Sequence, residues 1–169
     1  MTPSASPFTC RNWRKSATKR SCFTGEPPSL CLGHRESIDF DFFTDQTFLP
    51  EQLLANPERT PDGNLEVASL QDLLAHKLKV LLQRVEMKDY LDIDALLQNG
   101  MDLAQGCAGA RAMFAAFSPQ ECLKALTYFN DSSLQALSVQ LKQRLVTAAA
   151  GVKSIPDVRV KSKELSMRR

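Results

Sequence analysis

Two carboxylates, Asp39 and Asp41, stand two residues apart inside an otherwise apolar run of the sequence. In a β-strand, residues i and i+2 project to the same face, so this spacing predicts a strand over residues 37 to 43 that presents both acids together. Unpaired carboxylates on one face are costly to desolvate, whereas Mg²⁺ takes oxygen ligands from one or two carboxylates and from substrate phosphates. The pattern therefore favours a divalent metal site. The alternative is an edge strand whose acids are solvated or paired with Arg35.

A second set of charged residues lies on a predicted helix that begins after Ser69. Asp72 stands three residues later, which is an acidic form of the capping box, and residues 70 to 86 contain neither Gly nor Pro. We therefore expect one long helix. At about 100° per residue, Lys77 and Arg84 fall on the same face as the leucines of this segment, and a buried cation needs a carboxylate or phosphate partner.

Two roles are open for these cations. Lys77 and Arg84 either reach the phosphates of a nucleotide, as a point charge and a bidentate fork, or form an ion-pair network with nearby acids. Asp89 and Asp92 are three residues apart and share one helix face, where they orient the basic residues or ligate a metal. Because Lys88 already supplies a cation beside them, orientation is the favoured role.

The residues around these groups resemble a known family. Leu-Gly-His-Arg-x-Ser-hydrophobic-Asp-hydrophobic-Asp-Phe-Phe, over residues 32 to 43, resembles motif I of the AbiEii/AbiGii family of nucleotidyltransferase toxins. Residues 65 to 98, with a Ser-Leu-x-Asp-Leu run and a Lys-Asp-Tyr-Leu-Asp run, resemble the second conserved block of that family. Residues 123 to 129 continue the likeness more weakly.

The resemblance implies a DNA-polymerase-β-like nucleotidyltransferase fold that transfers a nucleoside monophosphate from a nucleoside triphosphate, with Mg²⁺ as cofactor. Some members modify the acceptor end of tRNA and are held in check by an antitoxin, so tRNA and a cognate antitoxin are the expected partners. Resemblance and spacing together give the expected site. Asp39 and Asp41 are the expected metal ligands, and together with Lys77 they are the expected catalytic residues. The expected nucleotide-binding residues are Arg35, Ser37, Lys77, Arg84, Lys88, Asp89 and Asp92.

The chain departs from the family pattern in two places. The family has Gly-Gly-Thr or Gly-Gly-Ser before a short apolar helix, where backbone N–H groups hold the triphosphate, but residues 24 to 31 read Thr-Gly-Glu-Pro-Pro-Ser-Leu-Cys. The prolines remove donors and Glu26 adds negative charge. Residues 50 to 65 read as a loop, where the family has further strands and a third carboxylate. We therefore expect weak or absent catalysis.

The genetic code offers an explanation for the first departure. Read from the third base of the Thr24 codon, the codons allowed for residues 24 to 31 permit Gly-Gly-Thr-Ala-Leu-Ala-Leu, which is the missing family motif. We therefore expect residues 1 to 31 to be disordered or translated out of frame, in a disrupted, truncated member of the family. The excess of Lys and Arg in this segment also fits an arm that binds RNA phosphates or a solvated tail.

Composition limits the number of domains and the class of protein. A chain of 169 residues, with 43% hydrophobic residues, 24% charged residues and a formal charge of +2, suits one domain with a modest core. No apolar run approaches the roughly 20 residues of a membrane-spanning helix. The five cysteines lack metal-binding spacings. We expect no membrane contact, no zinc site, and a cytoplasmic protein whose thiols stay reduced, with Cys107 and Cys122 as small apolar helix residues.

The expected fold is α+β, with a partial polymerase-β-like nucleotidyltransferase sheet packed on a C-terminal helical bundle. We assign the remnant sheet and its loop to residues 32 to 64, the helical region to residues 65 to 156, and a frayed tail to residues 157 to 169. Within the bundle, Ser118-Pro119-Gln120-Glu121 predicts the start of a helix over residues 119 to 128.

After the turn at Asn130-Asp131-Ser132, leucines at intervals of three to four residues predict another helix that runs to about Val152. Tyr128 and Phe129 adjoin apolar positions, so we expect both rings to close the core rather than to stack on bases.

The expected family function is Mg²⁺-dependent transfer of a nucleoside monophosphate from a nucleoside triphosphate to an acceptor such as tRNA, impaired in this chain. The alternative, from a different class, is a noncatalytic, degenerate helical protein that only binds a partner, either an antitoxin or RNA.

Overall fold

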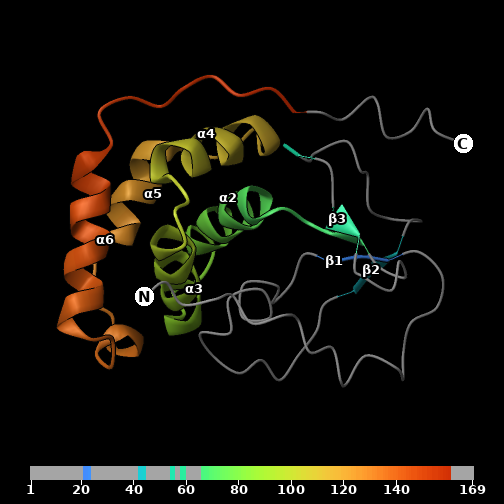
Figure 1. The fold of residues 1–169 in the computed structure, drawn as a ribbon. Coiled ribbons are helices and arrows are strands. Elements are labelled where there is room, and N and C mark those ends of the chain that lie inside the picture. Colours follow the sequence, from blue (N-terminus) through green and yellow to red (C-terminus); the bar gives the residue numbers. More distant parts are fainter. Residues whose placement is uncertain (1–20, 24–41, 45–53, 56–57, 60–65, 161–169) are drawn as a thin grey trace, which may run out of the picture.

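A computed structural model describes residues 21–23, 42–44, 54–55, 58–59 and 66–160 of the chain. Short strands come first in this described part, and helices follow (Figure 1). The elements in chain order are β1 Ser21–Phe23, β2 Phe42–Thr44, β3 Glu58–Arg59, β4 Glu66–Val67, α2 Leu70–Leu81, α3 Met87–Gln98, α4 Leu103–Met113, α5 Pro119–Leu126, the 3₁₀ helix η3 Ser132–Leu134, and α6 Val139–Gly151.

The short strands pair in the order β2-β1-β4-β3. β1 runs antiparallel to β2 and parallel to β4, and β3 runs antiparallel to β4. Of the predicted strand over residues 37 to 43, residues 42 and 43 lie in β2, and residues 37 to 41 lie outside the described residues. The segment over residues 50 to 65, expected as loop, contains β3 because backbone pairing with β4 organises Glu58–Arg59.

The predicted long helix over residues 70 to 86 is wrong, because the chain turns after α2 ends at Leu81. The backbone N–H of Leu82 donates to the carbonyls of Lys79 and Val80, and the N–H of Gln83 donates to the carbonyl of Val80 at 2.8 Å. These bonds close the last turn of α2. No local breaker enforces this turn, and its effect is to fold α3 back along α2, which places acids of α3 beside Lys77.

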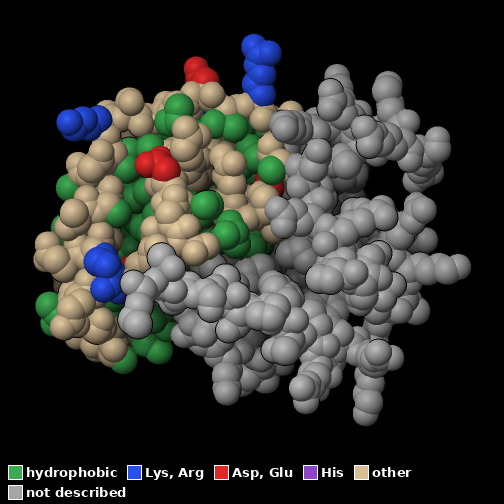
Figure 2. Space-filling model, viewed as in Figure 1, with side chains coloured by type: hydrophobic (Ala, Val, Ile, Leu, Met, Phe, Trp, Pro, Cys, Tyr) green, Lys and Arg blue, Asp and Glu red, His purple; other side chains and the backbone are tan. Residues whose placement is uncertain are grey.

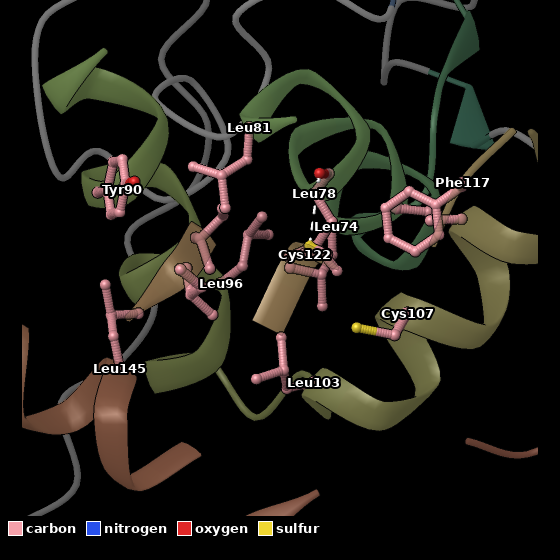
Figure 3. Packing of buried hydrophobic residues seen from close by; sticks show 14 of the residues in the cluster. Leu74, Leu78, Leu81, Tyr90, Leu96, Leu103, Cys107, Phe117, Cys122 and Leu145 are labelled. Atoms are coloured by element: carbon pink, nitrogen blue, oxygen red, sulfur yellow. Dashed lines mark hydrogen bonds between the residues drawn. The ribbon is translucent and has the colours of Figure 1, made fainter. Parts of the chain in front are cut away.

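The core lies where α2 and α4 cross, and α3, α5 and α6 close it from the other sides (Figure 3). Leu74 and Leu78 of α2 face α4 at the close approach of the two helices. A Cβ atom on Gly106 would lie only 2.6 Å from Leu74 Cδ2, so the missing side chain is what admits this leucine. Cys107 and Cys122 are buried free thiols, as expected of small apolar helix residues.

Helix α5 begins as predicted, with Ser118 Oγ accepting from the N–H of Glu121 and Pro119 in the first turn. It ends at Leu126, two residues before the expected end. Tyr128, which follows this end, is 59% exposed, so the prediction that it closes the core is wrong. Phe129 is partly buried and packs against the core, which confirms that half of the prediction.

The predicted helix to about Val152 is interrupted, because η3 and a turn precede α6. Ser138 begins α6, since its hydroxyl accepts from the N–H of Leu141 at 3.2 Å. After α6 the chain passes over α4 (Figure 1), where Arg111 Nη2 donates to the carbonyl of Pro156 at 3.0 Å and to Asp157 Oδ1 at 2.8 Å. None of the described helices has the length and apolar character that a membrane crossing requires.

The close approach of α4 to α2 predicts that Gly106→Val is destabilising. The added side chain would overlap Leu74 and Leu78, and overpacking of this kind costs about 1–3 kcal/mol. Gly151→Val is the matched control, because a Cβ there meets nothing within 4 Å. Urea denaturation should show a clear loss of unfolding free energy for Gly106→Val alone. Equal effects of the two substitutions would contradict this account of the packing.

Tyr90 predicts a loss of stability at alkaline pH. Burial raises the pKa of Tyr90 to about 12, and the charges of Asp131 and Asp89 add to the effect. Because the pKa in the folded state exceeds the unfolded value of about 10, the neutral phenol contributes stability that is complete below pH 10 and is lost as the pH rises toward 12. Urea midpoints measured between pH 8 and 11.5 should fall more steeply for the wild type than for Tyr90→Phe. Parallel curves would contradict the prediction.

Candidate functional site

The ammonium group of Lys77 is buried between two carboxylates. Lys77 Nζ lies 3.1 Å from Asp89 Oδ1 and 2.7 Å from Asp92 Oδ2. The Lys77 side chain is 7% exposed, and the two aspartate side chains are fully buried. Lys77 sits on the second turn of α2, and both acids sit on the first turns of α3, so the pairing depends on the turn between the helices.

Arg84 joins this network from the turn between α2 and α3. Its Nε donates to Asp89 Oδ2 at 3.1 Å, while its Nη1 lies 3.4 Å from Glu86 Oε1. Lys88 Nζ lies 3.3 Å from the other oxygen of Glu86. The side chains of Arg84 and Lys88 are each about two-fifths exposed, so the network runs from the buried ammonium of Lys77 to the surface.

The structure brings five predicted site residues together: Lys77, Arg84, Lys88, Asp89 and Asp92. It does so differently from the sequence prediction, which put Lys77 and Arg84 on one face of one long helix, with Lys88 on the same face if that helix continued. That arrangement is wrong, because Arg84 lies beyond the end of α2 and Lys88 belongs to α3.

Asp89 and Asp92 both pair with basic residues of the network. Each acid places an oxygen on the ammonium of Lys77, and Asp89 uses its second oxygen on Arg84. In the part of the chain that the structure describes, no group of three or more His, Cys, Asp or Glu side chains is placed to hold a metal ion. The described network is therefore one of paired charges.

The other predicted site residues lie outside the described residues. These are the proposed metal ligands Asp39 and Asp41 and the two nucleotide-binding residues that precede them in the sequence, Arg35 and Ser37. Their part in the site stays a prediction.

Sequence reasoning missed an apolar rim around the exposed end of the network. Leu82, Val85 and Met87 alternate with the charged residues of the turn and are each more than a third exposed. Ser133 Oγ donates to the carbonyl of Val85 at 3.3 Å and so ties this turn to η3. No sequence pattern marks this rim, because apolar residues next to a predicted helix read as core.

Two polar residues near the start of α2 were also missed as candidates. Asp72 was predicted only as a capping partner of Ser69, yet its carboxylate is fully buried and accepts hydrogen bonds from the backbone of Leu54 and Ala55. His76 packs edge-on against Phe114, with ring centroids 5.2 Å apart. Burial lowers the pKa of His76, and among the described residues its Nε2 has no hydrogen-bond partner.

The buried charges predict a large effect of Lys77→Met on stability. Removal of the ammonium leaves Asp89 and Asp92 buried with less positive charge beside them, and loss of one partner from a buried ion pair costs about 3–5 kcal/mol. Lys124→Met is the matched control, because Lys124 is exposed and such surface changes stay within about 0.5 kcal/mol. Chemical denaturation of both variants measures the difference. A loss below about 1 kcal/mol for Lys77→Met would contradict the burial of an essential pair.

Comparison with known proteins identifies the family of the chain. Residues 46–150 match the family model described as nucleotidyl transferase AbiEii toxin, type IV TA system. The match covers more than half of the chain and includes α2 to α5, nearly all of α6, and the whole Lys77 network. Comparisons with curated proteins and with solved structures found no match. The resemblance seen in the sequence is thereby confirmed, and the chain belongs to the AbiEii family of nucleotidyltransferase toxins of type IV toxin–antitoxin systems.

Proposed function

We propose that this chain is a nucleotidyltransferase-like toxin that transfers a nucleoside monophosphate from a nucleoside triphosphate to an acceptor such as tRNA, with impaired activity. The observation that carries the proposal is the family match over residues 46–150, which contains the Lys77 network. Asp39 and Asp41 precede the matched stretch and enter the proposal through their spacing and their likeness to motif I.

Asp39 and Asp41 are the proposed ligands of Mg²⁺, since paired carboxylate oxygens are the donors that this hard cation prefers. When bound, the metal supplies positive charge that neutralises the triphosphate and aligns it. Arg35 and Ser37 flank these acids in the sequence and are proposed to contact phosphate oxygens. The sheet that carries them, assigned to residues 32 to 64, is proposed to be the nucleotidyltransferase part.

The basic side chains of the Lys77 network are the proposed contacts for the rest of the triphosphate. Ion pairs with Asp89 and Asp92 hold the ammonium of Lys77 in place, so its charge needs no rearrangement when the reaction begins. Arg84 and Lys88 extend this charge to the surface of the turn. There they would contact the phosphates and stabilise the charge that develops on the leaving pyrophosphate.

The proposal includes weak catalysis, a partner and a location. Residues 24 to 31 lack the family glycines that hold the triphosphate on backbone N–H groups, which would weaken nucleotide binding. Membership of a type IV toxin–antitoxin family supports an antitoxin as the partner. The cytoplasm, where nucleoside triphosphates and tRNA occur, is the proposed location.

A second candidate function is that of a noncatalytic binding protein. It is favoured by the completeness of the ion-pair network, in which Lys77 and Arg84 already have carboxylate partners without a nucleotide. Charged side chains of the described residues are scattered over the face seen in Figure 2 and do not gather into a basic patch there. For this candidate, membership of a type IV toxin–antitoxin family favours an antitoxin as the partner.

Labelled nucleotide incorporation tests the proposal. Purified folded protein, Mg²⁺, each of the four labelled triphosphates and bulk tRNA should give weak incorporation. Asp39→Asn combined with Asp41→Asn should reduce it to background, because the proposed metal ligands are lost while the shape of the side chains is kept. Glu121→Gln is the control, since it neutralises an exposed acid on α5 and should keep wild-type incorporation.

Two outcomes would contradict the proposal. Folded wild-type protein that incorporates none of the four nucleotides would remove the transfer activity and leave the binding function. Incorporation that survives loss of both Asp39 and Asp41 would place the metal elsewhere.

A further inference from the structure

Residues 54 and 55 are held against the helical bundle by a buried side chain and by a backbone hydrogen bond. In the chain this segment lies between β2 and β3, well before α2 begins. The Leu54 side chain is buried in the core and contacts α4 so closely that a Cβ on Gly109 would lie 2.3 Å from Leu54 Cδ1. The backbone N–H of Leu54 donates to Asp72 Oδ1 at 2.6 Å.

The carboxylate of Asp72 is surrounded by hydrogen-bond donors. Its Oδ2 accepts from Ser69 Oγ at 2.5 Å and from the N–H of Ala55 at 3.4 Å, while Oδ1 accepts from the N–H of Leu54. Asp72 is fully buried, and among the described residues no Lys or Arg forms a salt bridge with it. Burying a carboxylate without a cation costs free energy unless hydrogen-bond donors satisfy its oxygens. The N–H groups of Leu54 and Ala55 are two of these donors, so the charge of Asp72 favours keeping this backbone in place.

Capping of α2 does not account for this arrangement. Ser69 Oγ already accepts from the N–H of Asp72 at 3.1 Å, which completes the cap at that end of the helix. An acid in the first turn can meet the helix dipole while it remains in water. Asp72 is instead buried, and its shortest bond to a backbone N–H reaches Leu54, 18 residues away in the sequence.

We propose that Asp72 is a positioning residue that fixes the backbone of Leu54 and Ala55 against the start of α2. Lys77 lies five residues farther along α2, which is about 7.5 Å of helix at 1.5 Å per residue. The bond from Asp72 to Leu54 therefore ties the backbone at Leu54, which follows the proposed metal ligands Asp39 and Asp41 in the sequence, to the helix that carries Lys77. Group transfer depends on the relative placement of such groups to within about 1 Å. This last step rests on the proposed function, and the anchor itself does not.

Amide hydrogen exchange, followed by NMR, tests the anchor without any activity. In Asp72→Ala the amide of Leu54 should exchange about 10- to 100-fold faster than in the wild type, because a hydrogen bond to a charged acceptor is lost. Ser69→Ala is the control, since it removes the cap of the same helix and the hydroxyl bonded to Asp72 Oδ2, but leaves Asp72 Oδ1 for Leu54. The amide of Leu78, in the middle of α2, reports global opening.

Asp72→Asn keeps the proposal testable if Asp72→Ala does not fold. Its amide oxygen still accepts from Leu54, so the exchange of Leu54 should rise by only about 3- to 10-fold, as a neutral acceptor binds about half as strongly as a charged one. The anchor is overturned if Leu54 exchanges equally in the Asp72 and Ser69 variants. It is also overturned if the amides of Leu54 and Leu78 accelerate by the same factor.

Steady-state kinetics tests the positioning of the site. Asp72→Ala should lower kcat for nucleotide incorporation at least about tenfold and keep KM for the nucleoside triphosphate within about threefold, because groups are displaced while binding residues remain. Ser69→Ala should keep both constants near the wild-type values. Faster exchange at Leu54 with unchanged kcat would overturn the positioning role. A wild-type enzyme without incorporation would instead remove the proposed function, and the exchange result would still decide the anchor.

Discussion

The burial of one ammonium group is the constraint on which the described structure depends. Lys77 belongs to the apolar face of α2, and a cation placed there must find negative charge within the protein. Asp89 and Asp92 supply it, which requires α3 to fold back along α2 and the first helix to stop at Leu81. The turn between the helices then places Arg84 at the surface end of the same network. A single electrostatic requirement thus sets both a helix boundary and a candidate site.

Close packing of α4 on α2 also restricts where Lys77 can place its charge. Helix α4 approaches α2 through glycines, so the leucines on either side of Lys77 interlock with α4 and leave α2 little freedom to rotate. The carboxylate of Asp72 also holds the backbone of Leu54, which precedes the helices in the sequence. The backbone at Leu54 and Ala55 is therefore joined to the helical bundle by packing and by hydrogen bonds.

Local signals predicted helix starts well and helix ends poorly. Ser69 and Ser118 were recognised as caps because a hydroxyl three residues before an acid bonds a specific N–H, which is a short-range interaction. The end of α2 and the exposure of Tyr128 were missed. Neither position carries Gly or Pro, so the sequence offers no strong local stop signal there, and a periodicity argument does not contain one.

The sequence by itself determined the family, the charged residues of the candidate site and the ion-pair network as one of two uses for Lys77, because these depend on residue types and on spacing along the chain. Only the tertiary structure showed which acids pair with Lys77, since these partners lie 12 and 15 residues away in the sequence and meet it after a turn that no local pattern marks. It alone showed the long-range bond of Asp72 to Leu54. Electrostatic pairing of buried charge acts across space, so its outcome depends on which helices pack together.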